Sequence, residues 1–129
     1  MKKAVSVVRR LFGLALVLAG IDHFVTFLPH REIGGSAATL VSALEETGYI
    51  LTLVHAVNLV AGLCLLCSLF APLAVLLATP FVLNVFLFHL FLDPEGLFVA
   101  VPLLFLHAFL VWGYRYHYDE LLQAKAQVW

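Results

Sequence analysis

Seven polar side chains interrupt the apolar segments of this chain, and they are the residues whose types could do chemistry. They are four histidines, two asparagines and one aspartate: Asp22, His23, His55, Asn58, Asn84, His89 and His107. Ionisable groups at membrane depth are costly and mark functional sites by default. An imidazole can bind a metal, move a proton or hydrogen-bond a ligand, and a carboxamide both donates and accepts. We take all seven as candidate ligand-binding residues and assign no catalytic residue.

The composition places these residues in a membrane protein. Of the 129 residues, 64% are hydrophobic and 12% are charged, and the mean hydropathy is +1.05. A soluble domain averages about 45–50% apolar and about 25% charged residues. The net charge is −1 and the sequence has no basic stripe, which argues against nucleic acid as a partner. The expected surrounding is the lipid bilayer of a bacterial or archaeal cytoplasmic (inner) membrane.

Four apolar segments are each long enough to cross the bilayer, which takes about 20 residues. They cover residues 8–28, 49–70, 72–92 and 97–116. The stretch 36–46 has apolar residues at helical spacing and predicts a short amphipathic helix in the membrane interface. Short turns at Ala71-Pro72 and Asp93–Gly96 make the last three segments antiparallel. Residues 1–129 are therefore expected to form one all-α domain, an antiparallel bundle of four transmembrane helices with an interfacial helix between spans one and two.

Charge sets the expected orientation of these spans. Lysine and arginine stand before or at the start of the first span and at or after the end of the fourth, at Lys2, Lys3, Arg9, Arg10, Arg115 and Lys125. The positive-inside rule then predicts that both termini are cytoplasmic. At about 1.5 Å per residue, the seven polar residues lie about 5–15 Å from the outer ends of their spans, so one shared site should open outward. Asn84 and His89 are about 140° apart on one helix, so they cannot both point at the bundle centre.

Three stretches of the chain resemble the DoxX family of small four-span membrane proteins. The first is Arg10-Leu-Phe-Gly-Leu with Gly20-Ile-Asp-His-Phe24, the second is Thr47-Gly-Tyr with Gly62-Leu-Cys-Leu-Leu66, and the third is Pro80-Phe-Val-Leu-Asn84 with Phe88-His-Leu-Phe-Leu-Asp-Pro94. The resemblance implies a four-helix bundle and an envelope redox setting, since the family is named after a subunit of a thiosulfate:quinone oxidoreductase. Many members carry a glutamate in span two, near where this chain has Asn58.

Together these features favour a DoxX-like inner-membrane subunit whose outward-facing polar pocket binds a quinone, a lipid or another small molecule in a redox-linked complex. Such a subunit is not expected to be an enzyme on its own, and it would contact other membrane protein subunits or a second copy of itself. Three alternatives stay open: a structural or assembly subunit, with Trp129 as a candidate contact, a metal- or haem-binding membrane protein, and a small-solute transporter. The transporter ranks last because no inverted repeat is evident.

The candidate residues also have structural interpretations. His55 and Asn58 lie three residues apart on one helical stripe and could form a polar clamp between helices. Asp22 could hold the tautomer of His23 or raise its pKa, or the two could simply neutralise each other near the interface. His89 lies close to the next turn, and for this residue a hydrogen bond to its own loop is the favoured interpretation.

Metal and thiol chemistry have weaker support in the sequence. A haem held by two histidines needs imidazoles at matching depth on facing helices, and His55 and His107 come nearest to that. Copper or zinc would also accept imidazole ligands, whereas His107 could instead hydrogen-bond a neighbouring helix. Cys64 and Cys67 lie deep in a predicted helix, away from the helix start that lowers a thiol pKa, so they are expected to be small buried hydrophobic residues.

Overall fold

The computed structural model describes residues 1–125 and 128, and the regular structure of these residues is helical. Four helices are long and apolar enough to cross a membrane: α1 (Lys2–Val25), α3 (Ile50–Cys67), α4 (Ala71–Phe91) and α5 (Leu97–Gly113), the last together with a 3₁₀ turn (Pro94–Gly96). A shorter helix, α2 (Gly35–Glu46), lies between the first two. The predicted fold class is confirmed, and the chain is a small multi-span membrane protein. Trp129 lies outside the described residues.

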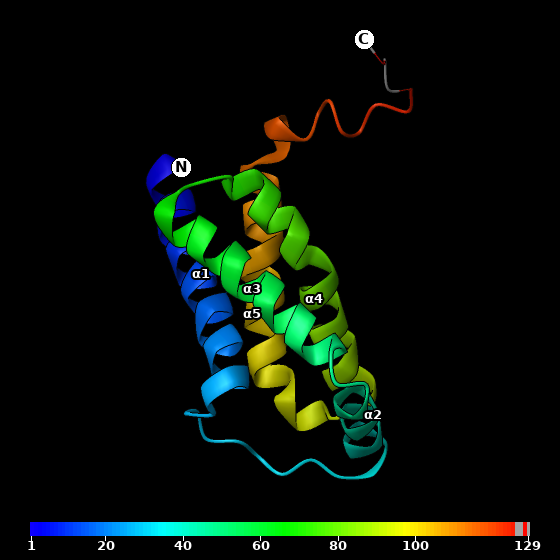
Figure 1. Cartoon of the computed structure of the whole chain (residues 1–129). Helices are drawn as coiled ribbons and strands as arrows, with labels where there is room; N and C mark the ends of the chain where they lie inside the picture. The colour runs from blue at the N-terminus through cyan, green and yellow to red at the C-terminus, as the bar shows by residue number, and fades with distance from the viewer. Residues whose placement is uncertain (126–127, 129) are drawn as a thin grey trace.

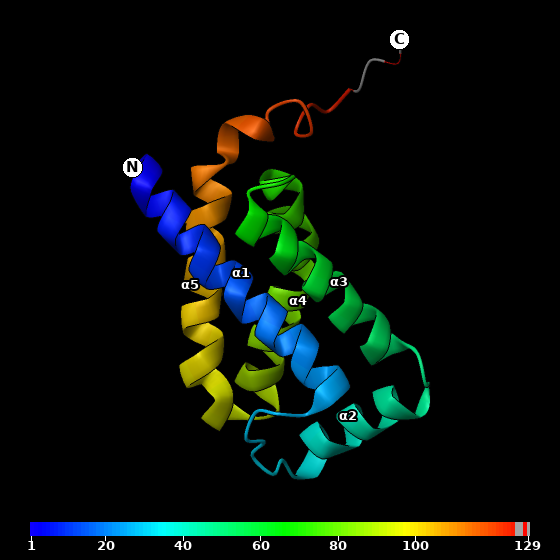
Figure 2. The same ribbon diagram turned by 60° about the vertical axis from the view of Figure 1, so that its left-hand side comes forward.

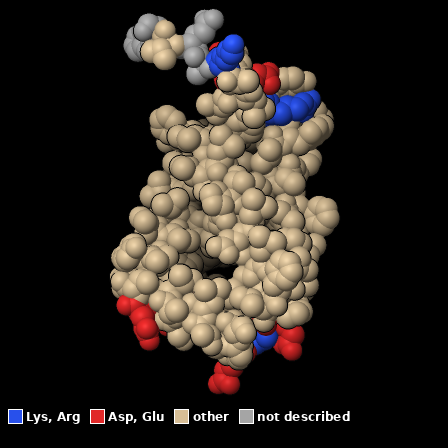
Figure 3. All heavy atoms as spheres, turned by 90° about the vertical axis from the view of Figure 1, so that its right-hand side faces the viewer, with Lys and Arg blue, Asp and Glu red and all other residues tan. Residues whose placement is uncertain are grey.

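The bundle has two ends that differ in their elements (Figures 1 and 2). The N-terminus, the α3–α4 turn and the segment after α5 lie at one end, which we name the terminal end. Helix α2 and the α4–α5 turn lie at the other end, which we name the loop end. Figure 3 shows charged side chains at both ends and none in the band between them on that face. Such a band is the surface that a protein presents to the hydrocarbon core of a bilayer.

Helices α1 and α3 pack closely because glycines stand where they cross. A Cβ on Gly62 of α3 would lie 2.7 Å from the carbonyl oxygen of Gly13 in α1, and a Cβ on Gly20 would lie 3.0 Å from the carbonyl oxygen of His55. Small residues permit this close approach of membrane helices. Asn58 lies one turn before Gly62 on α3, so the same packing helps to bury it.

Three helices, α1, α3 and α5, differ at their ends from the boundaries drawn on hydropathy. Helix α1 begins at Lys2 rather than residue 8, since no proline or glycine interrupts that stretch, and it ends where Thr26 adopts a left-handed conformation with φ 50°. Helix α3 ends at Cys67 because Ser68 turns the chain with φ 61°. Helix α5 ends at Gly113 and is followed by a separate 3₁₀ turn. Hydropathy predicts the length of an apolar segment, whereas helix ends depend on local backbone geometry.

The bundle core consists of large apolar side chains with alanines between them. Its largest apolar members are Phe12, Leu16, Leu65, Val75, Val82 and Leu110. The outward faces are also apolar, and Phe98 and Phe105 of α5 are exposed where lipid would cover them. Cys64 is half-buried, but Cys67 is exposed. The prediction that both cysteines are buried is therefore wrong for Cys67, because α3 ends at this residue.

Aromatic side chains connect the segment after α5 to the bundle at the terminal end. The Tyr118 hydroxyl donates a hydrogen bond to the carbonyl oxygen of Pro72 at the start of α4, at 3.0 Å. Burial raises the pKa of Tyr118 to about 12. The Arg115 guanidinium lies 4.7 Å from the ring centroid of Trp112 and 4.3 Å from that of Tyr116. Aromatic rings of this kind are common where a protein leaves the membrane.

Candidate functional site

A cavity of about 960 Å³ lies between α2, α3 and α4, toward the loop end. Most of its lining is aliphatic or aromatic, and it includes Leu53 and Leu77, which are exposed on the side of the bundle. Figure 3 shows the hollow from this side, within the band that carries no charged side chain. The cavity therefore faces the region that the bilayer would occupy.

Four of the seven candidate residues line this cavity. His55 and Asn58 come from α3, Asn84 and His89 come from α4, and His30 in the loop before α2 adds a fifth polar side chain. Asn84 and His89 point in directions about 140° apart around α4, yet both line the cavity. Both can do so because the cavity lies beside α4 and not on the bundle axis. These four polar side chains thus share a cavity on the side of the bundle, whereas the sequence predicted one shared site that opens outward.

Two polar atoms of α3 beside this cavity are buried without a hydrogen-bond partner. Asn58 is only 1% exposed, and neither its Nδ2 nor the Nδ1 of His55 has a partner among the described residues. The backbone of Ala19 in α1 lies near the His55 ring, so the Asn58 amide is the clearer of the two unpaired groups. Leaving a buried polar group unpaired costs about 1–3 kcal/mol. Because the Asn58 amide nitrogen is a donor, an oxygen atom is the group that would satisfy it.

His23 supports the imidazole of His55 without lining the main cavity. The two rings are stacked, with centroids 4.5 Å apart and planes 12° from parallel. His23 Nε2 lies 3.3 Å from the Thr52 hydroxyl oxygen on α3, which holds the ring in place. His23 also lines a separate hollow of about 100 Å³ together with Glu45. His23 thus contacts His55 from α1 and is not among the residues that line the main cavity.

Asp22 stabilises the chain that leaves α1. Its Oδ1 accepts hydrogen bonds from the amides of Phe27 and Leu28, at 2.9 and 2.7 Å. Its Oδ2 lies 2.8 Å from Nε2 of His30. The imidazole that Asp22 binds is therefore that of His30, whereas the sequence suggested the adjacent His23.

His107 lies in the core, where it joins α5 to α4. The residue is 4% exposed, and its Nε2 lies 3.1 Å from both the Thr79 hydroxyl oxygen and the Val75 carbonyl oxygen. Its ring centroid is 5.6 Å from that of Phe12 in α1. These contacts match the alternative of a hydrogen bond to a neighbouring helix, and His107 is not among the residues that line the cavity.

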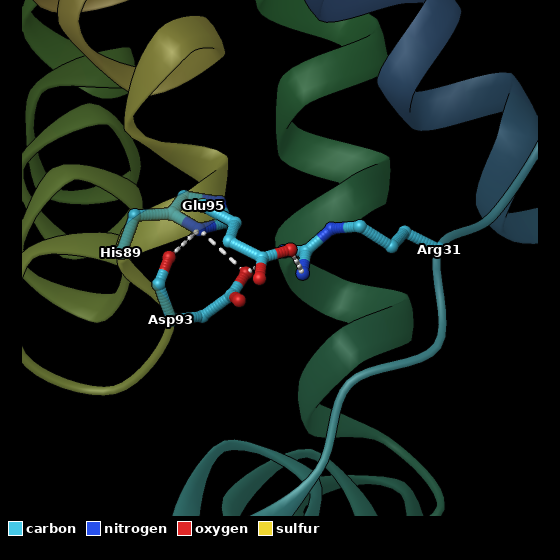
Figure 4. Close-up of polar contacts among 4 residues, drawn as sticks. All are labelled: Arg31, His89, Asp93 and Glu95. Atoms are coloured by element: carbon cyan, nitrogen blue, oxygen red, sulfur yellow. Dashed lines mark hydrogen bonds and ion pairs between the residues drawn. The ribbon is translucent and has the colours of Figure 1, made fainter.

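His89 belongs to a polar cluster at the loop end, which Figure 4 shows in close-up. Its Nδ1 lies 3.0 Å from Oδ2 of Asp93 and 3.2 Å from the Asp93 carbonyl oxygen. Arg31, in the loop after α1, donates one hydrogen bond to the same Oδ2 of Asp93 and another to Glu95 Oε2 at 2.8 Å. A Cβ on Gly96 would overlap the His89 ring, so glycine at this position leaves the space the ring needs.

The charges of Arg31 and Asp93 each favour the ionised form of the other. The hydrogen bond from Arg31, followed by its charge and by the His89 contact, lowers the pKa of Asp93. The same contacts to Asp93 and Glu95 raise the pKa of Arg31. An ionised Asp93 can only accept, so His89 Nδ1 carries the proton in this bond and Nε2 of a neutral ring is left as an acceptor. The sequence pattern did not predict this ion pair, although Arg31 is the only lysine or arginine between Arg10 and Arg115.

The arrangement of donors does not resemble a metal centre. Among the described residues, no group of three or more His, Cys, Asp or Glu side chains is placed to hold a metal ion. The two histidines that came nearest to a haem pair have other surroundings, because His55 stacks on His23 and His107 is hydrogen-bonded in the core.

No family model matches the chain, and no curated protein and no solved structure matches it either. What the structure establishes is a small membrane protein with four membrane-length helices.

Proposed function

We propose that this protein binds a quinone-like molecule taken from the bilayer in the cavity between α2, α3 and α4. The proposal is carried by one unpartnered buried atom, Nδ2 of Asn58, a residue that lines an otherwise largely apolar cavity. A ligand carbonyl oxygen that accepts from Asn58 would remove the cost of leaving this donor unpaired. A quinone head group combines such carbonyl oxygens with an apolar ring and tail, and a lipid ester carbonyl offers the same acceptor.

The size and position of the cavity agree with this ligand class. Pockets for small molecules occupy about 300–1,000 Å³ and are mostly apolar with a few placed polar groups. This cavity has about 960 Å³, and its lateral rim includes Leu53, which is 59% exposed. A tail could therefore stay in contact with lipid while the head group reaches Asn58.

The wider setting is part of the proposal. The resemblance to the DoxX family supports a small subunit of a redox-linked complex in an inner membrane, with other membrane subunits or a second copy as partners. Lysine and arginine at the terminal end support an orientation with both termini in the cytoplasm and the loop end outside. In this setting the chain would hold the head group, by way of His55, Asn58, Asn84 and His89, and a partner would exchange electrons with it. Asp22, His23 and His107 would maintain the architecture around them.

The proposal is tested on the full chain in lipid nanodiscs. Bound lipids and quinones are extracted and identified by mass spectrometry, and binding of a short-chain ubiquinone is measured by titration. We expect a quinone to bind at about one molecule per chain, and Asn58→Leu to weaken its binding by about fivefold or more, because the ligand then no longer relieves the cost of about 1–3 kcal/mol of an unpaired buried donor.

His107→Leu is the matched control, since this side chain is buried but does not line the cavity. It should leave quinone affinity unchanged. A wild-type protein that carries no quinone and does not bind the added one would overturn the proposal for quinones. An ordered phospholipid in its place, lost in Asn58→Leu, would assign the cavity to lipid.

A further inference from the structure

The segment between α1 and α3 forms one wall of the cavity. Three apolar side chains of α2 line it: Leu40, Val41 and Leu44. Helix α2 itself is poorly anchored by burial, because Ala37 is its only buried residue. In Figures 1 and 2 this helix lies across the loop end, outside the bundle of the four long helices. Moving α2 away would therefore open the cavity at the loop end and leave the four-helix core in place.

Glycines flank α2 at both of its ends. Gly35 has φ 60° and Gly48 has φ 74°, a region that other residues rarely adopt. A Cβ on either glycine would meet nothing within 4 Å, so the space into which a side chain would project is open at both positions. Each end of α2 thus has a glycine in a conformation that other residues rarely adopt.

The segment is fixed to the bundle at two places, near α1 through Asp22, which binds Phe27, Leu28 and His30, and farther along through the ion pair of Arg31. The side chain of Asp93 is 10% exposed and that of Glu95 is 78% exposed, so the contact with Asp93 is the better shielded of the two. Exposed ion pairs contribute little, whereas shielded and hydrogen-bonded ones contribute more. A second attachment joins His30 to Asp22 at 2.8 Å.

His89 links this attachment to the interior of the cavity. It lines the cavity and binds the same Oδ2 atom of Asp93 that Arg31 binds. Its Nε2 is the acceptor of the neutral ring. A ligand hydroxyl that donates to Nε2 would polarise the ring and strengthen the Nδ1–H bond to Asp93, since hydrogen bonds in a chain reinforce one another.

We propose that residues 26–48 form a lid over the loop end of the cavity, that Arg31 latches the lid to Asp93, and that a ligand bound at His89 holds the latch closed. The first two parts concern the ligand-free protein and stand independently of the ligand. The third part rests on the function proposed above.

The lid is tested by the rate at which a membrane-impermeant maleimide labels single cysteines in a chain whose Cys64 and Cys67 are replaced by alanine. Val41→Cys reports the half-buried inner face of α2, and Ser42→Cys reports its exposed face. Val75→Cys, at a position that is 0% exposed, reports whether the core stays closed.

In the ligand-free protein, adding Arg31→Gln should speed the labelling of Val41→Cys about tenfold, the value of one hydrogen bond to a charged group. Adding Gly96→Ala, which moves the His89 ring away from Asp93, should act in the same direction. The neighbouring Glu32→Gln is the matched control and should have no effect. The rates at Ser42→Cys and Val75→Cys should not change.

Unchanged labelling of Val41→Cys in both latch variants would overturn the lid. Faster labelling of Val75→Cys alongside it would also overturn the lid, because the whole bundle would then be opening. Added short-chain ubiquinol, whose hydroxyl can donate to His89 Nε2, should slow the labelling of Val41→Cys more than the same occupancy of ubiquinone, which has no hydroxyl to donate. If Arg31→Gln acts as expected but ubiquinol binds and slows the labelling no more than ubiquinone does, the lid stands and its coupling to the ligand is refuted.

Discussion

The Asn58→Leu substitution tests whether Asn58 binds a ligand or only holds two helices together. Asparagine and leucine have the same number of side-chain heavy atoms and the same branching at Cγ, so Asn58→Leu removes the amide chemistry with little change of shape. If Asn58 were a polar clamp between helices, its loss would destabilise the bundle. If its Nδ2 is unpaired until a ligand arrives, its loss should stabilise the ligand-free protein.

The expected magnitude follows from the burial of this side chain. At 1% exposure the amide receives almost no compensation from solvent, and an unsatisfied buried donor costs about 1–3 kcal/mol. The ligand-free Asn58→Leu protein should therefore gain up to about that amount in free energy of unfolding. Asn84→Leu is the matched comparison, because Asn84 lines the same cavity but is exposed, and it should change stability little.

The assay is unfolding of the ligand-free protein by sodium dodecyl sulfate in mixed micelles, followed by helical circular dichroism. Quinone affinity is measured on the same samples. The reasoning requires stability to rise and affinity to fall in Asn58→Leu. A loss of about 0.6–1.7 kcal/mol, the range for a hydrogen bond between membrane helices, would refute it and make Asn58 a clamp.

Three further results are expected. Gly62→Ala should destabilise the bundle by about 1–3 kcal/mol because its Cβ would meet α1 backbone, whereas Gly34→Ala, with open space around it, should not; equal unfolding curves would contradict this. His107→Leu should cost about 0.6–1.7 kcal/mol; unchanged stability would show that its bonds to α4 contribute nothing. Because Arg31 lowers the pKa of Asp93 below 3.8, the latch contributes fully above that pH and is lost as pH falls through the lower, folded value. At about pH 6–8, where a maleimide still finds thiolate to react with, the ratio of the labelling rates at Val41→Cys and Ser42→Cys should therefore stay constant, and adding Asp93→Asn should raise this ratio throughout that range.

The architecture was predictable because membrane helices follow from composition and length. Each span needed only a long apolar run, and the turns Ala71-Pro72 and Asp93–Gly96 fixed the antiparallel order. The glycines within the first two spans are likewise typical of membrane helices that pack closely. These features are local in the sequence, so they do not depend on how each helix is rotated.

The contacts between polar side chains were not predictable, because they are not local in the sequence. Depth along a helix placed seven residues at one level, but rotation about the helix axis decides which neighbour each one meets. The sequence therefore did not predict that His107 contacts Thr79 of the adjacent helix, or that Asp22 contacts His30 in a loop. The contact between Arg31 and Asp93 joins residues far apart in the sequence, and no helical spacing reports such a pair.

The near contact of α1 and α3 has a consequence for how the protein is made. With backbone atoms facing backbone atoms at Gly13 and Gly62, the two helices fit together at one register only, since a shift would bring side chains into the crossing. Their partner surfaces are complete once Cys67 has entered the bilayer. We therefore expect this hairpin to assemble first during membrane insertion and to serve as the template on which α4 and α5 are later added, so that the cavity is the last part of the molecule to form.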